Sequence, residues 1–556
     1  MHDTYWKVVW KQYRKSRVGV SALCLLGVLS LIGIYAPLFA SAKPLVVVWN
    51  HQIYFPLLRY LFFTGFYTKP IDLFFNLLML TLPVAFLSRL FLRVRLWWIG
   101  AVFLQMGLFF WLILNPIKDP AYQERKAITT ESYRFHGDPL IAPLPAQKSW
   151  ELELQALTPY SKLNQLLEYR YLKMQHERLS RYFTHFSERM GRDPPTLWLV
   201  RQRNLIAQKE QLQQIMQDSE KLYAVSKQQL PELVNAYLPF SHSLMLAKVA
   251  LQRGEGQELE KIIKEASDQR IALENTRAHM IQFEKAFADA KYLDDKEKWL
   301  NHENQKLIVL IPPLLKTFHW EDDAGGSQEA NRFLPWWELT RLNRKDLIAS
   351  LLFGIRISLV VGLCSILLAL SIGIPLGLTA GYFAGKADLI ICRLIEMWEA
   401  MPTFFMLLLI IAITQTKSIF LVISVLGMFG WTGMARFIRS EVLKQRNLPY
   451  VAACQSLGFA NSRIMFSHIL PNAIPPILTL LPFSIMGAIT SEAGLSFLGL
   501  GEEGSTSWGV LMDEGRTVFP SESYLLWPPA ILLSVLLISI ALVGDRLRDA
   551  IDPKMH

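Results

Sequence analysis

The sequence predicts an all-α polytopic membrane protein with about eight transmembrane helices and an inserted, extracytoplasmic helical domain that resembles a coiled coil. The first observation is composition: 52% of the 556 residues are hydrophobic and only 19% are charged, whereas soluble proteins carry about 25% charged residues. The second is the series of apolar stretches of roughly 20 residues, the length that crosses a bilayer. The third is a long charged stretch with helical periodicity between them.

The charges are unevenly distributed. Residues 117–345 hold 33 Lys and Arg against 31 Asp and Glu, while the rest of the chain holds 24 against 16. The apolar parts therefore carry few charges, and these are mostly positive. This pattern favours a membrane protein with positive loops on one side and argues against a nucleic-acid binder. The four cysteines are isolated and predict neither a disulfide framework nor a metal site.

Three spans are expected before the charged middle and five after it. The predicted spans cover about 18–39, 71–91, 96–115, 349–380, 394–414, 418–437, 469–492 and 525–544. The first apolar stretch is too long for a signal peptide and is followed by only a weak cleavage pattern, which favours an uncleaved span. With eight spans, every basic cluster falls on the same side as the N-terminus. The positive-inside rule then places both termini in the cytoplasm and the middle outside it.

The predicted spans and the charge distribution divide the chain into three parts. We expect an N-terminal membrane region at 1–116, a helical insertion at 117–345 and a membrane core at 346–556, with a cytoplasmic loop at 438–468. Within the insertion, apolar side chains recur at helical spacing in three stretches. Gly191 is expected to end the first helix, Pro231 to interrupt the second, and the third to cover about 257–308. Antiparallel hairpins of this kind favour a structural lobe, with a docking surface for a partner as the alternative.

The cytoplasmic loop contains a second feature, the segment from Tyr450 to Pro476. Its small residues Ala452, Ala453 and Cys454 predict a thin helix surface that another protein can approach closely. Gly458 permits a turn that other residues resist, and the pair Leu470-Pro471 is expected to begin the next helix. By composition alone, the segment is either a lever that transmits a partner's motion or an ordinary intracellular loop.

This segment resembles the EAA loop of permease subunits of binding-protein-dependent ABC importers, whose pattern is EAA-x3-G-x9-I-x-LP. Gly458 and Leu470-Pro471 match at the expected separation, and His468 stands in the Ile position. The stretch 490–501, the Ser507-Trp508-Gly509 triplet and the ending 544–553 resemble the peptide and nickel branch. The segments 344–359 and 15–40 are similar to the family's helix entries. The resemblance covers about half of the chain.

The resemblance implies a subunit without catalytic residues, cofactor or metal of its own. It implies as partners a second permease, two ABC ATPase subunits that bind ATP and Mg²⁺, a solute-binding protein and membrane lipid, with no nucleic acid. It also places the chain in a bacterial inner membrane. In the family the loop docks into the ATPase, so Ala452, Ala453, Cys454, Gly458, Leu470 and Pro471 are the predicted coupling residues. The acidic residue of the motif is missing, and the helices at 71–115 and the insertion have no family counterpart.

The remaining site candidates lie at the predicted outer end of the pathway. A carboxylate in a membrane span marks a functional or a structural site, so Glu492, with Ser496 and Phe497, is a candidate for the pathway or gate. Arg356 and Glu396 are interpreted as interfacial anchors. No Walker A motif, hydrolase triad or zinc-protease motif is found in the sequence.

Two functions are expected from these observations. The first is a permease subunit of an ATP-driven importer, with peptides as the cargo, working by alternating access. The alternative is a membrane scaffold or receptor that no longer transports and binds a partner through the insertion; the altered Ala-Ala-Cys triplet is its sequence support.

Overall fold

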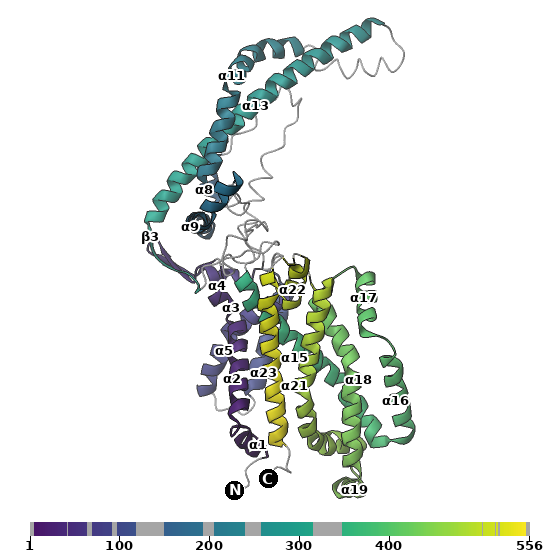
Figure 1. The fold of residues 1–556 in the computed structure, drawn as a ribbon. Helices are drawn as coiled ribbons and strands as arrows, with labels where there is room; N and C mark the ends of the chain where they lie inside the picture. Colours follow the sequence, from purple (N-terminus) through teal and green to yellow (C-terminus); the bar gives the residue numbers. More distant parts are fainter. Residues whose placement is uncertain are drawn as a thin grey trace.

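The computed structural model describes most of the chain. The described residues are 5–41, 43–63, 69–91, 97–117, 149–192, 205–238, 257–314, 347–502, 504–517, 519–520 and 523–551. They are mostly helical and form a membrane-type bundle with an elongated lobe at one end (Figure 1). The N- and C-terminal helices lie at the opposite end of the bundle from the lobe.

The first part of the bundle comes from the N-terminal region. It contains α1 (Tyr5–Tyr13), α2 (Arg17–Ile34), the short α3 (Ala36–Phe39) and α4 (Pro56–Tyr60), and the pair α5 (Pro70–Phe91) and α6 (Trp97–Leu114). Ser16 caps α2 by accepting a hydrogen bond from the Gly19 N–H, as expected of an N-cap residue. α2 packs against both α15 (Leu347–Phe383) and α23 (Trp527–Ile551), so the first span is part of the core.

The centre of the bundle is the pair α15 and α18 (Ile419–Arg446). Gly373, Gly377 and Gly381 recur every four residues along α15, and a Cβ at each would stand within 2.9 Å of an atom of α18. Small residues at this spacing let two helix backbones approach closely, which is how helices associate in lipid. This glycine stripe therefore fixes the packing of α15 on α18.

The last helices complete the bundle. They are the short α19 (Pro449–Ser456) and α20 (Asn461–Arg463), a π-helix (Ile464–Ile469), α21 (Leu470–Leu495), a second π-helix (Ser496–Leu500) and α22 (Trp508–Thr517), followed by α23. α21 packs against α15, α18 and α23. The described residues also include one short 3₁₀ turn, Ser523–Leu525, before α23.

One predicted span is broken. The stretch expected at 394–414 consists of α16 (Gly385–Glu399) and α17 (Thr403–Thr414), which meet at an angle of 69°. Pro402 stands at the break, and the residue before a proline disfavours the helical conformation. Among the described residues, six helices are long and apolar enough to cross a membrane, or seven with this bent pair. The apolar part of α6 is shorter, so the count of eight stays a prediction.

The lobe is built from α8 (Trp150–Ala156), α9 (Pro159–Met190), α11 (Leu205–Tyr237) and α13 (Gln257–Gln305). α9 begins with the Thr158 cap and Pro159 and ends at Gly191 in the left-handed conformation, as predicted. α11 and α13 form a long hairpin in which the Tyr223 and Phe283 rings stack at 4.3 Å. The prediction that Pro231 interrupts the second helix is wrong: α11 continues through it.

A small sheet at the base of the lobe departs from the all-α prediction. β1 (Val46–Trp49) pairs with β2 (Gln52–Tyr54) and, on its other side, with β3 (Leu307–Ile311), both antiparallel. The sheet thus joins the N-terminal region to the end of the predicted insertion. One face, with Val47 and Trp49, packs on α8, α9 and α13. The Trp49 indole N–H donates to Glu303 Oε2 at 3.1 Å.

Candidate functional site

The segment between α18 and the following helix is a short helix closed by a glycine turn. Pro449 lies in the first turn of α19, where its missing N–H costs nothing. Gly458 has φ 73°, a conformation that favours glycine. The Phe459 N–H closes the turn by donating to the Cys454 carbonyl oxygen at 3.1 Å. Gly458 therefore forms the turn that the sequence predicts, while its role in coupling stays a prediction.

The two faces of α19 differ. Val451 and Cys454 are buried in the core formed by α15, α18 and the π-helix at 464–469. Ala452 and Ala453 are exposed. The three small residues expected on one thin surface are thus divided: the alanines remain accessible and the cysteine packs inward. What is left open is a smooth patch that another chain can approach.

Two polar contacts connect α19 to the membrane helices. The Tyr382 hydroxyl, near the end of α15, donates to Asn461 Oδ1 at 2.9 Å. The same hydroxyl accepts a hydrogen bond from Gln455 Nε2 at 3.4 Å. A displacement of α19 therefore acts on both α15 and the start of the 461–500 helix.

Leu470 and Pro471 begin α21, as predicted, with Pro471 in its first turn. The chain is helical from Asn461 to Leu500, with the π-helix Ile464–Ile469 directly before Leu470. Proline offers no N–H to the preceding turn, and a widened π turn is one way a helix accommodates such a defect. α21 therefore continues directly from α20 and the π-helix, while α19 is set apart from them by the Gly458 turn.

The side chains of Phe459 and Arg463, which precede this π-helix, pack beside His468, which lies on it. The rings of His468 and Phe459 stack, with centroids 5.7 Å apart. The Arg463 guanidinium lies 4.6 Å from the centre of the Phe459 ring. The buried His468 Nε2 has no hydrogen-bond partner among the described residues. This stack fixes the turn that follows Gly458 against the start of the long helix.

A cavity of about 1170 Å³ opens between α15, α17, α18 and α21. Its walls combine small residues on α18 and α21 with aromatic and aliphatic side chains. The small residues are Gly430, Gly433, Ser484, Gly487, Ser491 and Gly494. Phe497 and Leu498 line the end formed by the second π-helix. Since the lining is largely apolar with scattered hydroxyls, it suits a solute that presents both apolar and polar groups.

Glu492 lies beside this cavity but not in its lining. Its side chain is 1% exposed. Oε1 accepts hydrogen bonds from Ser496 Oγ at 2.8 Å and from Ser507 Oγ at 2.6 Å. No ion pair is formed by Glu492 with any described residue. The carboxyl thus joins the end of α21 to the loop before α22, and a buried polar group needs such partners.

The C-terminal end of α21 leads into a turn of its own. Gly499 has φ 83° inside the second π-helix. Gly509, on α22, leaves no room for a Cβ, which would lie 2.5 Å from the Ala493 carbonyl oxygen. α22 is therefore packed directly onto α21. Of the three predicted gate residues, Glu492 and Ser496 hold this joint together and Phe497 faces the cavity.

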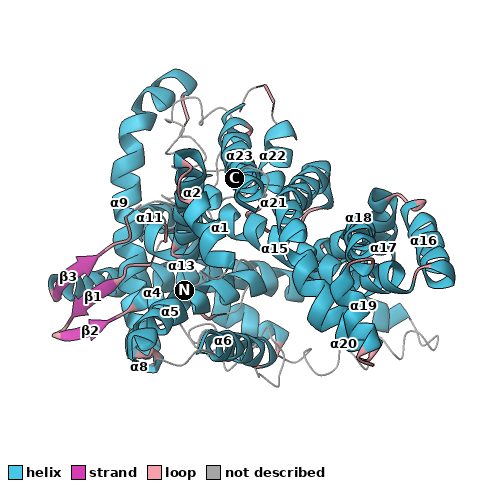
Figure 2. Ribbon diagram, turned by 90° about the horizontal axis from the view of Figure 1, so that it is seen from below, coloured by secondary structure: helices cyan, strands magenta, loops and turns pink. Residues whose placement is uncertain are grey.

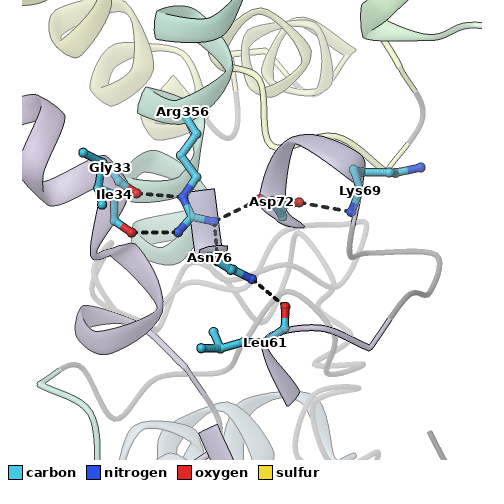
Figure 3. A network of polar contacts seen from close by, with 7 residues as sticks. All are labelled: Gly33, Ile34, Leu61, Lys69, Asp72, Asn76 and Arg356. Atoms are coloured by element: carbon cyan, nitrogen blue, oxygen red, sulfur yellow. Dashed lines mark hydrogen bonds and ion pairs between the residues drawn. The ribbon is translucent and has the colours of Figure 1, made fainter. Parts of the chain in front are cut away.

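Arg356 is not the interfacial anchor that the sequence suggests. Its side chain is completely buried at the centre of a polar network (Figure 3). The guanidinium donates to the backbone oxygens of Gly33 at 2.7 Å and Ile34 at 3.0 Å, and to Asn76 Oδ1 at 3.0 Å. It also pairs with Asp72 at 3.3 Å. Arg356 of α15 thus fastens α2 and α5 to the core.

The same network continues toward the segment after the second π-helix. The Lys69 N–H donates to Asp72 Oδ2 at 3.2 Å, and Lys69 Nζ lies 3.6 Å from Glu502 Oε1. Burial raises the pKa of Glu502, against the opposing effect of Lys69. Glu502 follows the second π-helix. The start of α5 is therefore connected electrostatically to the segment that carries Phe497 and Gly499.

Two known families match this sequence. Residues 373–556 match the family described as "Binding-protein-dependent transport system inner membrane component". Residues 4–56 match the "N-terminal TM domain of oligopeptide transport permease C". The two matches cover the first helices and most of the core, and leave α5, α6 and the lobe outside.

Individual relatives agree with these families. The oligopeptide transport system permease protein OppC of Bacillus subtilis is 35% identical over 40% of this chain and 72% of its own length. The corresponding OppC of Haemophilus influenzae is 31% identical over 45% of this chain and 80% of its own. The peptidoglycan transport system permease protein YejE of Agrobacterium fabrum is 36% identical over 39% of this chain but only 57% of its own.

Among solved structures, a chain of an inward-facing MetNI methionine ABC transporter aligns with 37% of this chain and over 98% of its own length, at 17% sequence identity. Its TM-score of 0.33 is too low to support an argument. The sequence matches are sufficient without it. The chain belongs to the family of binding-protein-dependent transport system inner membrane components, and within it to the peptide permeases. It is a multi-pass membrane protein.

Proposed function

We propose that this chain is one of two different membrane subunits of an ATP-driven importer that carries peptides across a bacterial inner membrane. The observation that carries the proposal is α19 with the Gly458 turn: a short helix with an open small-residue patch, bonded to α15 through Gln455 and Tyr382, whose turn leads into the helix that continues as α21. Partner ATPase subunits, which bind ATP and Mg²⁺, dock on this patch. Their closure and release move α15 and α21 and alternate the access of the pathway.

The arrangement of the ends supports this orientation. α19 lies at the end of the bundle that carries both termini, and the lobe lies at the other end (Figure 1). Basic residues precede α2 and stand at the ends of α18 and α23 on the α19 side, which is the pattern of a cytoplasmic face. The termini and α19 are then cytoplasmic, and the lobe is extracytoplasmic, where a solute-binding protein delivers cargo.

The cavity between α15, α17, α18 and α21 is the half of the pathway that this chain supplies. Its wall of Gly, Ser and apolar residues contains no described ion pair other than that between Arg436 and Glu399, which lies at its edge. Peptides expose a neutral backbone and varied side chains, and such a wall accepts them without selecting one charge. The second permease closes the cavity. The printed names of the relatives, which refer to oligopeptide and dipeptide transport, support the same cargo.

The coupling role is tested by Gly458→Arg. A side chain at φ 73° costs about 1–2 kcal/mol, and the bulky cation also obstructs the patch. We expect at least about a tenfold loss of co-purifying ATPase subunits, equivalent to roughly 1.4 kcal/mol, and loss of peptide uptake, with normal amounts of the chain in the membrane. The measurement is quantitative recovery of nucleotide-binding subunits with the tagged chain from native membranes.

Gly385→Arg is the matched control. Gly385 also has a positive φ, 53°, and open space around it, but lies between α15 and α16, outside the coupling segment. It should retain its ATPase subunits. Normal uptake by a stably inserted Gly458→Arg chain contradicts the coupling role. A wild-type chain that reproducibly lacks ATPase subunits instead favours the transport-inactive scaffold.

A further inference from the structure

The small sheet at the base of the lobe has one face that no described helix covers. In β1, the side chains of Val47 and Trp49 point to the buried face. Val46 and Val48 alternate with them and point the other way. Their partners across the ladder are Ile311, Val309 and Ile53. The uncovered face, here called the apolar sheet face, therefore consists of Val46, Val48, Ile53, Val309 and Ile311.

This face carries no polar side chain; its outer strands are exposed, and Val46 and Val48 of the central strand are partly exposed. Ile53 is 63% exposed, Ile311 46% and Val309 40%. The flanking residues Phe55 and Leu58 are also exposed. An antiparallel sheet with one face in water normally alternates apolar and polar residues. Here both faces are apolar, so the second face also requires an apolar environment.

The orientation of the sheet indicates what that environment is. In Figure 1 the sheet lies at the left, beyond the lobe-side end of the bundle. The lobe helices α8 and α9 lie to the right of the sheet, and α13 rises above it. In Figure 2, seen along the bundle from the end with the termini, the three strands appear side by side with no described helix in front of them. The apolar sheet face is thus turned toward the membrane plane, laterally beside the spans.

The chain connections place the sheet at the same level as the ends of the spans. β1 begins at Val46, shortly after α2 ends at Ile34, and α4 leads from β2 to the start of α5 at Pro70. Nearby cations are held on aromatic rings away from the face: Arg59 lies 4.0 Å from the Tyr160 ring centre and Lys43 4.7 Å from that of Tyr60. Nothing described on the face itself opposes contact with hydrocarbon.

We infer that the apolar sheet face rests on the bilayer surface, with its aliphatic side chains inserted among the lipid headgroups and upper acyl chains of the leaflet on the lobe's side. Apolar side chains at this depth bind a membrane interface in proportion to their buried area. The sheet then acts as a foot that fixes the base of the lobe. Because the face is uncharged, its seating does not depend on anionic lipid. This inference uses only the membrane-spanning character of the chain.

The test uses the full chain, with its four native cysteines replaced by alanine, in nanodiscs of phosphatidylcholine. Nitroxide spin labels are placed by Val309→Cys and Ile311→Cys. Leu222→Cys, exposed on α11 of the lobe, is the water control, and Phe103→Cys, exposed on α6, is the lipid control. Collision rates are measured with oxygen, which concentrates in lipid, and with a water-soluble nickel chelate.

We expect the ratio of oxygen to nickel accessibility at 309 and 311 to lie clearly above that at 222 and below that at 103. It should not change when phosphatidylglycerol replaces part of the lipid. A ratio equal to that at 222 means that the face is in water and overturns the inference. Low accessibility to both reagents means that protein covers the face, either another segment of this chain or a partner, and overturns it equally.

Discussion

Two helix pairs of this molecule, α15 with α18 and α11 with α13, are held together in opposite ways. α15 and α18 touch through glycines, with backbone against backbone and side chains that interlock around them. α11 and α13 touch through long side chains: the Tyr223–Phe283 stack, and Lys209 paired with Asp294 at 2.8 Å. In lipid there is no hydrophobic force between helices, so close packing must supply the attraction. In water, the burial of apolar side chains brings helices together without close contact between their backbones.

Buried charge follows the same division. The membrane region contains Arg356 of α15, which is completely buried and bonded to backbone oxygens at the end of α2 and to side chains of α5. The ion pair that joins α11 to α13 is partly exposed, with Lys209 at 21% and Asp294 at 44%, although Glu303 at the base of the lobe is buried. We therefore expect substitutions in the membrane region to be far more destructive than equivalent ones in the lobe.

The largest effect is expected for Arg356→Met. Methionine leaves Asp72 and Asn76 without their buried partner, and breaking a buried pair in this way costs about 3–5 kcal/mol. The apparent melting temperature of the purified full chain should fall sharply, measured by the amount that stays monodisperse after heating. Arg393→Met is the control because Arg393 is exposed on α16; it should change stability by no more than about 0.5 kcal/mol. Equal effects of the two variants contradict the role of the network.

A smaller effect is expected for Gly377→Ala. A single methyl group there stands 2.7 Å from the Ala435 carbonyl oxygen, and overpacking of this kind costs about 1–3 kcal/mol. Gly27→Ala adds the same methyl group to α2, where nothing lies within 4 Å. The same heating assay should separate them, with only the first losing stability. If both are unchanged, the α15–α18 contact is looser than its glycines indicate.

The smallest effect is expected in the lobe and depends on pH. Hydrogen bonds from Lys209 and Lys298 lower the pKa of Asp294 to about 2. Because this value lies below the usual 3.8, the pair stabilises the hairpin at pH above about 4, and the contribution is lost as pH falls toward 2. Asp294 is 44% exposed, so solvent screening limits the gain to less than about 1 kcal/mol.

Hydrogen exchange of α11 and α13 in the full chain measures this contribution. Protection should decrease between pH 4 and pH 2.5 after correction for intrinsic exchange, and Asp294→Asn should remove most of the decrease. Lys298 lies on the same helix at four residues' distance, so Lys298→Met should have only a minor effect. A decrease of equal size in Asp294→Asn would assign the pH response to other groups.

The sequence predicts local features of this molecule well. The apolar stretches locate the long helices, and the EAA-like spacing locates the Gly458 turn, because both depend on residues close together in the chain. Gly191 is likewise recognised as a helix end, since a left-handed cap requires little beyond its own position.

The features that the sequence does not predict depend on distant partners. Arg356 bonds to residues about 280–320 positions away, although an arginine ten residues inside an apolar stretch is itself a signal of a buried function. β1 and β3 pair across more than 250 residues, and short apolar runs alone fit a helix or a strand. Pro231 is misjudged because a proline usually interrupts a helix interior, whereas α11, which packs against α13, continues through it.

The contact between α2 and α23 has a consequence for how the chain is made. Gly19 lies so close to Arg546 that a Cβ would stand 2.9 Å from the arginine Cβ, and the Tyr13 hydroxyl closes the same corner by donating to the Gly19 carbonyl oxygen. At about 5–20 residues per second, the ribosome reaches Arg546 roughly half a minute to two minutes after Gly19. During that interval α2 lacks the partner that packs against Gly19 in the folded protein. Final assembly of the bundle is therefore a step that follows synthesis of the whole chain.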